Sequence, residues 1–199
     1  MKLYIHYKMG RKIYDNMTEN GIPLEKKLFI LGNLVPDILA TYIFNKHSHQ
    51  KCATHLKKLL KRTYKASLSS RLVFSYYSGV TAHYICDFLC YAHTSVFCGS
   101  LRDHLTYEKH QLFSDAEVPP FYIHDSMHYS LTELIQALEE RISGRVQLLS
   151  RNAATSLSDI PVAISIASWA TSAAYYHTEK CLQLRQNIEF YTHEHRKTA

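Results

Sequence analysis

Apolar residues recur with the spacing of an α-helix along almost the whole chain, and no segment shows the alternation that is typical of a β-strand. The helices expected from this pattern cover about 3–19, 23–34, 38–44, 49–65, 67–93, 101–113, 129–149 and 159–192. Only 6 glycines and 5 prolines occur in 199 residues, too few for a β-sandwich with a turn every ~10 residues. The sequence therefore predicts an all-α fold, a single-domain multi-helix bundle that spans residues 1–199.

Glycine, proline and capping residues mark where these helices should begin, end or pack. The first helix should end at Gly21, and the second should break at Pro36, which leaves Asp37 in a loop. Gly79, in the middle of the long apolar helix, indicates that a neighbouring helix approaches closely there. The serine and aspartate at 158–159 are candidates for the N-cap of the last helix.

Two features of the sequence indicate where in the cell the protein would be found: its most apolar segment and its N-terminus. Segment 160–176 carries no charge and has 17 residues, at the lower end of the ~17–25 that span a membrane. Because it is rich in Ser, Thr and Ala, we expect a buried core helix instead. The N-terminus lacks the apolar stretch of a secretory signal, and the 5 cysteines are an odd number in a chain that can fold without disulfides. We therefore expect a cytoplasmic protein with no transmembrane helix.

Basic residues outnumber acidic ones, 23 against 17, which gives a formal charge of +6. Many of them gather in and before the expected helix 49–65: Lys46, Lys51, Lys57, Lys58, Lys61, Arg62 and Lys65. This pattern has two interpretations. It could bind phosphate-rich partners, either nucleic acid or an anionic membrane surface, or it could be an ordinary solvated helix face.

The 13 histidines are patterned with carboxylates rather than scattered. In the expected central helix, His83, Asp87 and His93 fall within one sector of about 120°. The next helix places His104 and Glu108 four residues apart, on one face. Zinc accepts imidazole nitrogen and carboxylate oxygen, so each face could hold part of a metal site. The remaining candidate ligands are His6, Asp37, and either His47 or His49.

Each of these pairs alone could be a hydrogen bond or an exposed contact between helix neighbours. Burying His83 and Asp87 among apolar residues, however, is unfavourable without a partner, and a metal cluster supplies one. Eight ligands suit two or three zinc ions rather than one, and clustered zinc ions hydrolyse phosphodiesters. Cys90 shares the sector of His83 and is either a further ligand or, more simply, a small core residue.

The composite of these motifs resembles the zinc-dependent phospholipase C family, whose fold is shared by fungal zinc-dependent single-strand nucleases. The resemblance covers residues 1–115 and follows the order of the family's ligands. It rests on GNLVPDI at 32–38, the histidines at 47 and 49, GVTAHYICDFLCYAHT at 79–94 and HLTYEKH at 104–110. Residues 116–199 carry no motif of the family and would complete the bundle.

The resemblance implies a role for each candidate ligand. The implied ligands are Asp37, His47, His83 and Asp87 for the first zinc, His93, His104 and Glu108 for the second, and His6 for a third. Asp87 would bridge two ions, and His49 is the alternative to His47. In the family the third ion also binds the amino group of an N-terminal tryptophan. Because this sequence begins with Met1, we expect that site to have fewer protein ligands.

The leading hypothesis is a metal-dependent phosphodiester hydrolase that resembles phospholipase C and uses two or three zinc ions. Asp37 would orient or deprotonate the attacking water. A phospholipid headgroup ester is the expected substrate, with peripheral contact to an anionic membrane surface, and a nuclease with the same metal chemistry is the alternative. A non-catalytic, zinc-stabilised binding or structural protein is the alternative from another class.

Overall fold

A computed structural model describes residues 3–39, 49–111, 129–151 and 159–197, with side chains described for all of these except 49–53 and 180–197. These residues form α-helices and one short 3-10 turn, η1, and contain no strand, so the all-α prediction is confirmed. The elements are α1 (Leu3–Glu19), α2 (Lys26–Ile38), α4 (His49–Ser67), α5 (Arg71–Leu89), η1 (Tyr91–His93), α6 (Leu101–Gln111), α7 (Leu131–Arg151) and α8 (Asp159–Lys197).

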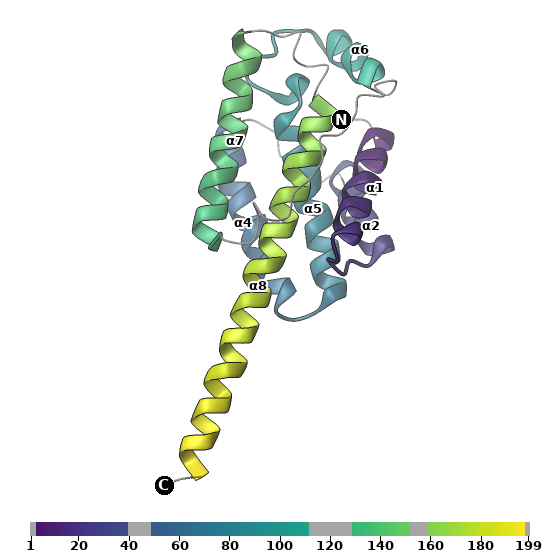
Figure 1. The fold of residues 1–199 in the computed structure, drawn as a ribbon. Helices are drawn as coiled ribbons and strands as arrows, with labels where there is room; N and C mark the ends of the chain where they lie inside the picture. The colour runs from purple at the N-terminus through teal and green to yellow at the C-terminus, as the bar shows by residue number, and fades with distance from the viewer. Residues whose placement is uncertain (1–2, 40–48, 112–128, 152–158, 198–199) are drawn as a thin grey trace.

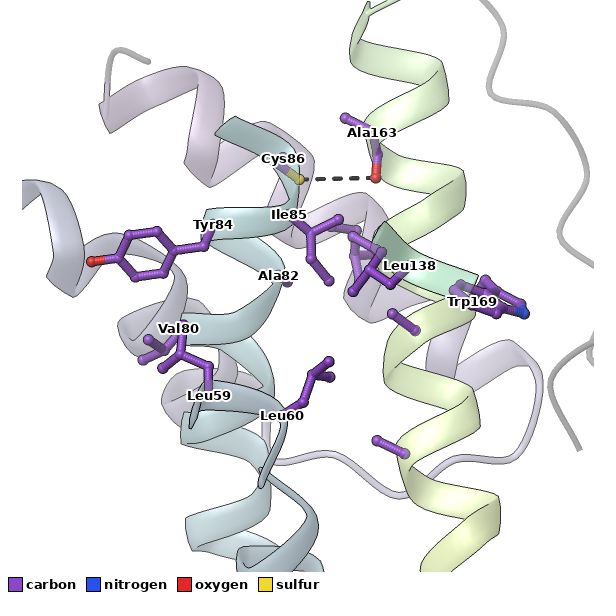
Figure 2. Close-up of a cluster of buried hydrophobic side chains, with 14 of the residues drawn as sticks. Leu59, Leu60, Val80, Ala82, Tyr84, Ile85, Cys86, Leu138, Ala163 and Trp169 are labelled. Atoms are coloured by element: carbon purple, nitrogen blue, oxygen red, sulfur yellow. Dashed lines mark hydrogen bonds between the residues drawn. The ribbon is translucent and has the colours of Figure 1, made fainter. Parts of the chain in front are cut away.

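Helix α5 lies at the centre of the bundle and packs against α2, α4 and α8 (Figure 1). Every residue from 78 to 89 is buried, which explains why apolar residues occur on all sides of this stretch rather than on one stripe. Figure 2 shows part of this core, where the Cys86 thiol points to the carbonyl of Ala163 on α8 and Leu138 of α7 packs alongside. Cys90 belongs to the same apolar cluster, which supports its role as a core residue.

The first half of α8 is the uncharged segment that the sequence marked as a core helix. Ala163, Ala167, Ala170 and Ala173 are buried there, and these small side chains let α8 lie close to its neighbours. The core-helix prediction is therefore confirmed. None of the helices described has the length and apolar character needed to cross a bilayer.

Two glycines bring α2 and α5 together. A methyl group added at Gly32 would overlap the backbone carbonyl of Tyr76, and one added at Gly79 would overlap that of Phe29. The close approach predicted at Gly79 is therefore confirmed. It also sets the backbone of Asn33, which follows Gly32, against the buried C-terminal half of α5.

The predicted helix break at Pro36 is wrong. Helix α2 continues through Pro36 to Ile38, and the Leu39 N–H closes its last turn on the carbonyl of Val35 at 3.0 Å. Pro36 removes one hydrogen bond, but it is buried and stands near the helix end, so packing outweighs the loss. Asp37 therefore lies on a helical turn rather than in a loop. The helix expected over 38–44 falls largely outside the described residues.

The predicted continuation of the central helix to His93 is also wrong. Helix α5 ends at Leu89 because Cys90 is extended, with φ −89° and ψ 131°, and η1 follows. His93 is therefore carried by a separate turn. Its position depends on what holds that turn, rather than on the register of α5.

The glycine contact between α2 and α5 gives a stability prediction. Gly79→Ala should lower the free energy of unfolding by ~2 kcal/mol or more, because its methyl group would overlap backbone that cannot rotate away. Gly144→Ala is the matched control, since Gly144 lies in the exposed interior of α7 with open space around it, and it should stabilise by ~0.5–1 kcal/mol. Urea unfolding measures both, and equal effects at the two positions would contradict the close approach.

Candidate metal centre

The fold brings six candidate ligands together in two groups, at the end of the bundle where Figure 1 marks the N-terminus. The first group is His6, His83 and Asp87, and the second group is His93, His104 and Glu108. Within each group, one ligand atom of each residue lies within 4.8 Å of the others. The side chains come from α1, α5, η1 and α6, so segments far apart in sequence meet here.

In the first group, two histidines face one buried carboxylate. His6 Nε2 lies 3.1 Å from Asp87 Oδ1, and His83 Nε2 lies 3.3 Å from Asp87 Oδ2. The two imidazole rings stack with their centroids 3.8 Å apart. Asp37, at the end of α2, approaches the same nitrogens at 3.8 Å from His6 and 3.7 Å from His83.

The orientation of His83 is fixed by a contact that the sequence analysis missed. Its Nδ1 lies 2.8 Å from the backbone carbonyl of Asn33, and because a carbonyl only accepts, Nδ1 must carry the hydrogen. In the neutral ring, Nε2 then presents a lone pair to the carboxylates of Asp37 and Asp87. His83 is fully buried, and among the described residues its Nε2 has no hydrogen-bond partner.

Lone pairs that face each other in a buried site repel, and a cation between them removes the repulsion. Zinc ligands of this kind commonly donate their other ring N–H to a backbone carbonyl, as His83 does to Asn33. The donor set of the first group, imidazole nitrogen with carboxylate oxygen, is also one that zinc prefers. The residues present therefore fit a zinc ion.

The second group is built on the short helix α6 and on η1. His104 Nε2 lies 3.0 Å from Glu108 Oε1, one turn along α6, and His93 Nε2 lies 3.7 Å from the same oxygen. His93 Nε2 is also 3.8 Å from Asp87 Oδ1. Asp87 therefore faces both groups, which is the position that a carboxylate bridging two ions requires.

The protonation states suit metal binding. Burial lowers the pKa of His6 to about 3, so its ring is neutral at pH 7. Burial opposes ionisation of Glu108, but hydrogen bonds from His93 and His104 outweigh it and lower the pKa of Glu108 to about 2. Burial likewise opposes ionisation of Asp87, but its electrostatic interactions with the groups that face it, the imidazoles of His93, His6 and His83 among them, hold its pKa well below the usual range. Neutral imidazoles and ionised carboxylates are the forms that bind zinc.

The histidine pair before α4 stays unresolved. His47 lies outside the described residues, and the side chain of His49 is not described, although His49 begins α4. Either could complete the first group, so the alternative between them remains a prediction. The assignment of His6 to a third ion also remains a prediction, while the structure places His6 in the same group as His83.

A further buried carboxylate, Asp159, lies near the second group, and the sequence analysis did not identify it as a functional residue. Asp159, the first residue of α8, accepts hydrogen bonds from the Tyr91 N–H, the Tyr107 hydroxyl and the Arg145 guanidinium. The sequence suggested only a helix cap at this position. Nothing in the local pattern identifies its partners, because they lie on three other elements.

Comparison with known proteins identifies a family. The sequence model of a family described as zinc dependent phospholipase C matches residues 5–151, about three quarters of the chain. The matched region includes both ligand groups and Asp37. A search of curated proteins and a search of solved structures each found no significant match.

The central position of Asp87 gives a metal-binding prediction. Asp87→Asn should reduce the zinc bound per chain to less than half, because an amide has no charge and only one oxygen that can bind an ion, whereas Asp87 faces histidines of both groups. Elemental analysis of protein purified without a tag or chelator measures the zinc content. Asp15→Asn, on α1 and outside both groups, is the control and should keep full zinc. Full zinc in Asp87→Asn would contradict the bridging position.

Proposed function

Because the chain belongs to the zinc-dependent phospholipase C family, we propose that it is a metal-dependent phosphodiester hydrolase that acts on the headgroup phosphodiester of a phospholipid. The observation that carries this proposal is the pair of ligand groups that face one carboxylate, Asp87. Phosphodiester hydrolysis needs charge stabilisation on several oxygens at once, and two adjacent cation sites provide it.

The residues that would hold zinc are His6, Asp37, His83, Asp87, His93, His104 and Glu108. Bound zinc supplies a Lewis acid and water of lowered pKa. Asp37 differs from the other two carboxylates because its side chain is 22% exposed, against 1% for Asp87 and 6% for Glu108. It is therefore the carboxylate that entering water and substrate can reach.

Asp37 is suited to accept a proton. Burial raises its pKa, so its carboxylate is a stronger base than an ordinary aspartate. In the proposed reaction, a water oxygen forms a bond to phosphorus while Asp37 takes the proton of that water. The bond between phosphorus and the glycerol oxygen breaks, and that oxygen takes up a proton from solvent. The products are a diacylglycerol and a phosphorylated headgroup.

Exposed apolar side chains around the ligand groups support a lipid substrate. Of the 11 large apolar side chains that are exposed in the described residues, seven lie at the start of α1, the end of α2 and on α6. We call these the apolar rim: Leu3, Tyr4, Tyr7, Ile38, Leu39, Leu101 and Leu105. Members of the rim directly follow His6, Asp37 and His104 in the sequence.

The composition of the apolar rim favours acyl chains over nucleic acid bases. Five of its seven members are aliphatic, and an aliphatic side chain cannot stack on a base as an aromatic ring does. Acyl chains, in contrast, bind to any apolar surface. A phospholipid whose headgroup phosphate reaches the ligand groups would place its chains along this rim.

Activity on vesicles tests the proposal. Zinc-loaded protein should release phosphorylated headgroup from phosphatidylcholine vesicles, and Asp37→Asn should lower kcat by ~100-fold or more because the proton acceptor is lost. Zinc content is measured on both proteins. Faster cleavage of single-stranded DNA than of vesicles would favour the nuclease. Zinc-bound protein that cleaves neither substrate would favour the non-catalytic alternative, and both outcomes contradict the proposal.

The apolar rim gives a second prediction about the substrate. Leu105→Glu should lower the rate on vesicles by ~10-fold or more and leave the rate on a water-soluble short-chain phospholipid unchanged, because the charge disfavours insertion among acyl chains. Leu72→Glu is the matched control, since Leu72 and Leu105 are both 49% exposed and Leu72 lies at the start of α5, far along that helix from His83. Equal losses from both variants would contradict contact between the rim and the lipid.

A further inference from the structure

Helix α6 carries two ligands of the second group, yet most of it faces solvent. Among its 11 residues, only Glu108 and Gln111 are buried. A short helix with so little buried surface has little apolar contact to hold it in place. Its two ligands nevertheless have to stay within a few ångströms of His93, which lies on η1.

Tyr107 links α6 to the rest of the bundle. Its hydroxyl donates a hydrogen bond to the carboxylate of Asp159, and its ring meets the ring of Tyr91 edge to face, with centroids 6.1 Å apart. Tyr107 directly precedes Glu108, so the residue that anchors the helix and the residue that faces the histidines are neighbours on α6.

Asp159 also binds η1, the turn that carries His93. Its Oδ2 accepts a hydrogen bond of 2.6 Å from the backbone N–H of Tyr91, two residues before His93. The same oxygen accepts the Tyr107 hydroxyl, while Oδ1 accepts the Arg145 guanidinium from α7. A single carboxylate, 0% exposed, therefore joins η1, α6 and α7 at the first residue of α8.

We propose that Asp159 is a positioning residue for the second ligand group: by holding the Tyr91 N–H and the Tyr107 hydroxyl on one oxygen, it sets η1 against α6 so that His93, His104 and Glu108 converge on one ion. This inference rests on the metal-binding part of the proposed function and not on hydrolysis. Asp159 lies beyond the residues 5–151 that the family shares, so the anchor comes from a part of the chain outside the family match.

If Asp159 served only to pair with Arg145 and stabilise the fold, its loss would have a different effect on zinc binding. Loss of a buried ion pair destabilises the bundle as a whole, and zinc would then fall in both groups together. Loss of a positioning residue weakens the second group alone, because His6, His83 and Asp87 are held by α1 and α5. The selectivity of the effect therefore distinguishes the two roles.

Zinc titration of Tyr107→Phe and Asp159→Asn measures that selectivity. In a background with His6→Ala and His83→Ala, which removes both histidines of the first group, each variant should weaken the remaining zinc affinity by ~10-fold or more. In a background with His93→Ala and His104→Ala, which removes both histidines of the second group, each should leave the remaining affinity unchanged within about twofold. Tyr107→Phe removes one hydroxyl, so it tests the proposal even if Asp159→Asn does not fold.

Hydrogen exchange on zinc-free protein tests the anchor without any metal. Both variants should increase amide exchange in α6 and η1 while leaving α1 unchanged, and Glu133→Gln, at the exposed first turn of α7, should change none of them. Equal loss of zinc in both backgrounds, or no change of exchange in α6, would overturn the positioning role. A wild-type chain that takes up zinc but hydrolyses no phospholipid would defeat the proposed function alone.

Discussion

The burial of one charged carboxylate governs the end of the bundle where the ligand groups lie. Asp87 stands on the central helix, 1% exposed, and a carboxylate at that depth is stable only if other groups compensate its charge. The nitrogens of His6, His83 and His93 that face it come from three different elements, and a cation held between them and Asp87 would compensate the charge. Asp87 therefore links α1, α5 and η1, because each of these elements places a histidine against its carboxylate.

The two ligand groups differ in how firmly the fold holds them. His83 and Asp87 lie on the fully buried half of α5, which the glycine contact with α2 locks in place, and Asn33 fixes the His83 ring. The second group lies on a short turn and a mostly exposed helix that meet at Asp159. Rigid support lowers the entropy that a bound ion must remove, so the first group should bind zinc more tightly than the second.

Helical periodicity and the i,i+4 pairs could be predicted because both are local. Within the described residues, helices cover most of the ranges that the periodicity predicts. The pairs His83–Asp87 and His104–Glu108 each lie one turn apart, with Nε2 to carboxylate oxygen distances of 3.3 and 3.0 Å. The errors arose where tertiary packing overrides local signals: α2 runs through Pro36 because that residue is buried, and His93 reaches Asp87 from a separate turn. The partners of Asp159 could not be predicted, because they lie 14 to 68 residues away in the sequence and such hydrogen bonds produce no periodic pattern in it.

The apolar rim and the buried ligands lie at the same end of the molecule but favour different surroundings. Ionised carboxylates require polar partners, whereas exposed leucine and isoleucine side chains around them are unfavourable in water and promote association. A chain whose partner is a nucleic acid gains little from aliphatic side chains there, and a purely structural zinc site gains nothing from them. A phospholipid meets both demands at once, because its phosphodiester is anionic and its chains are apolar. The coexistence of the two features at one end is therefore the strongest reason to prefer a lipid substrate over a nucleic acid.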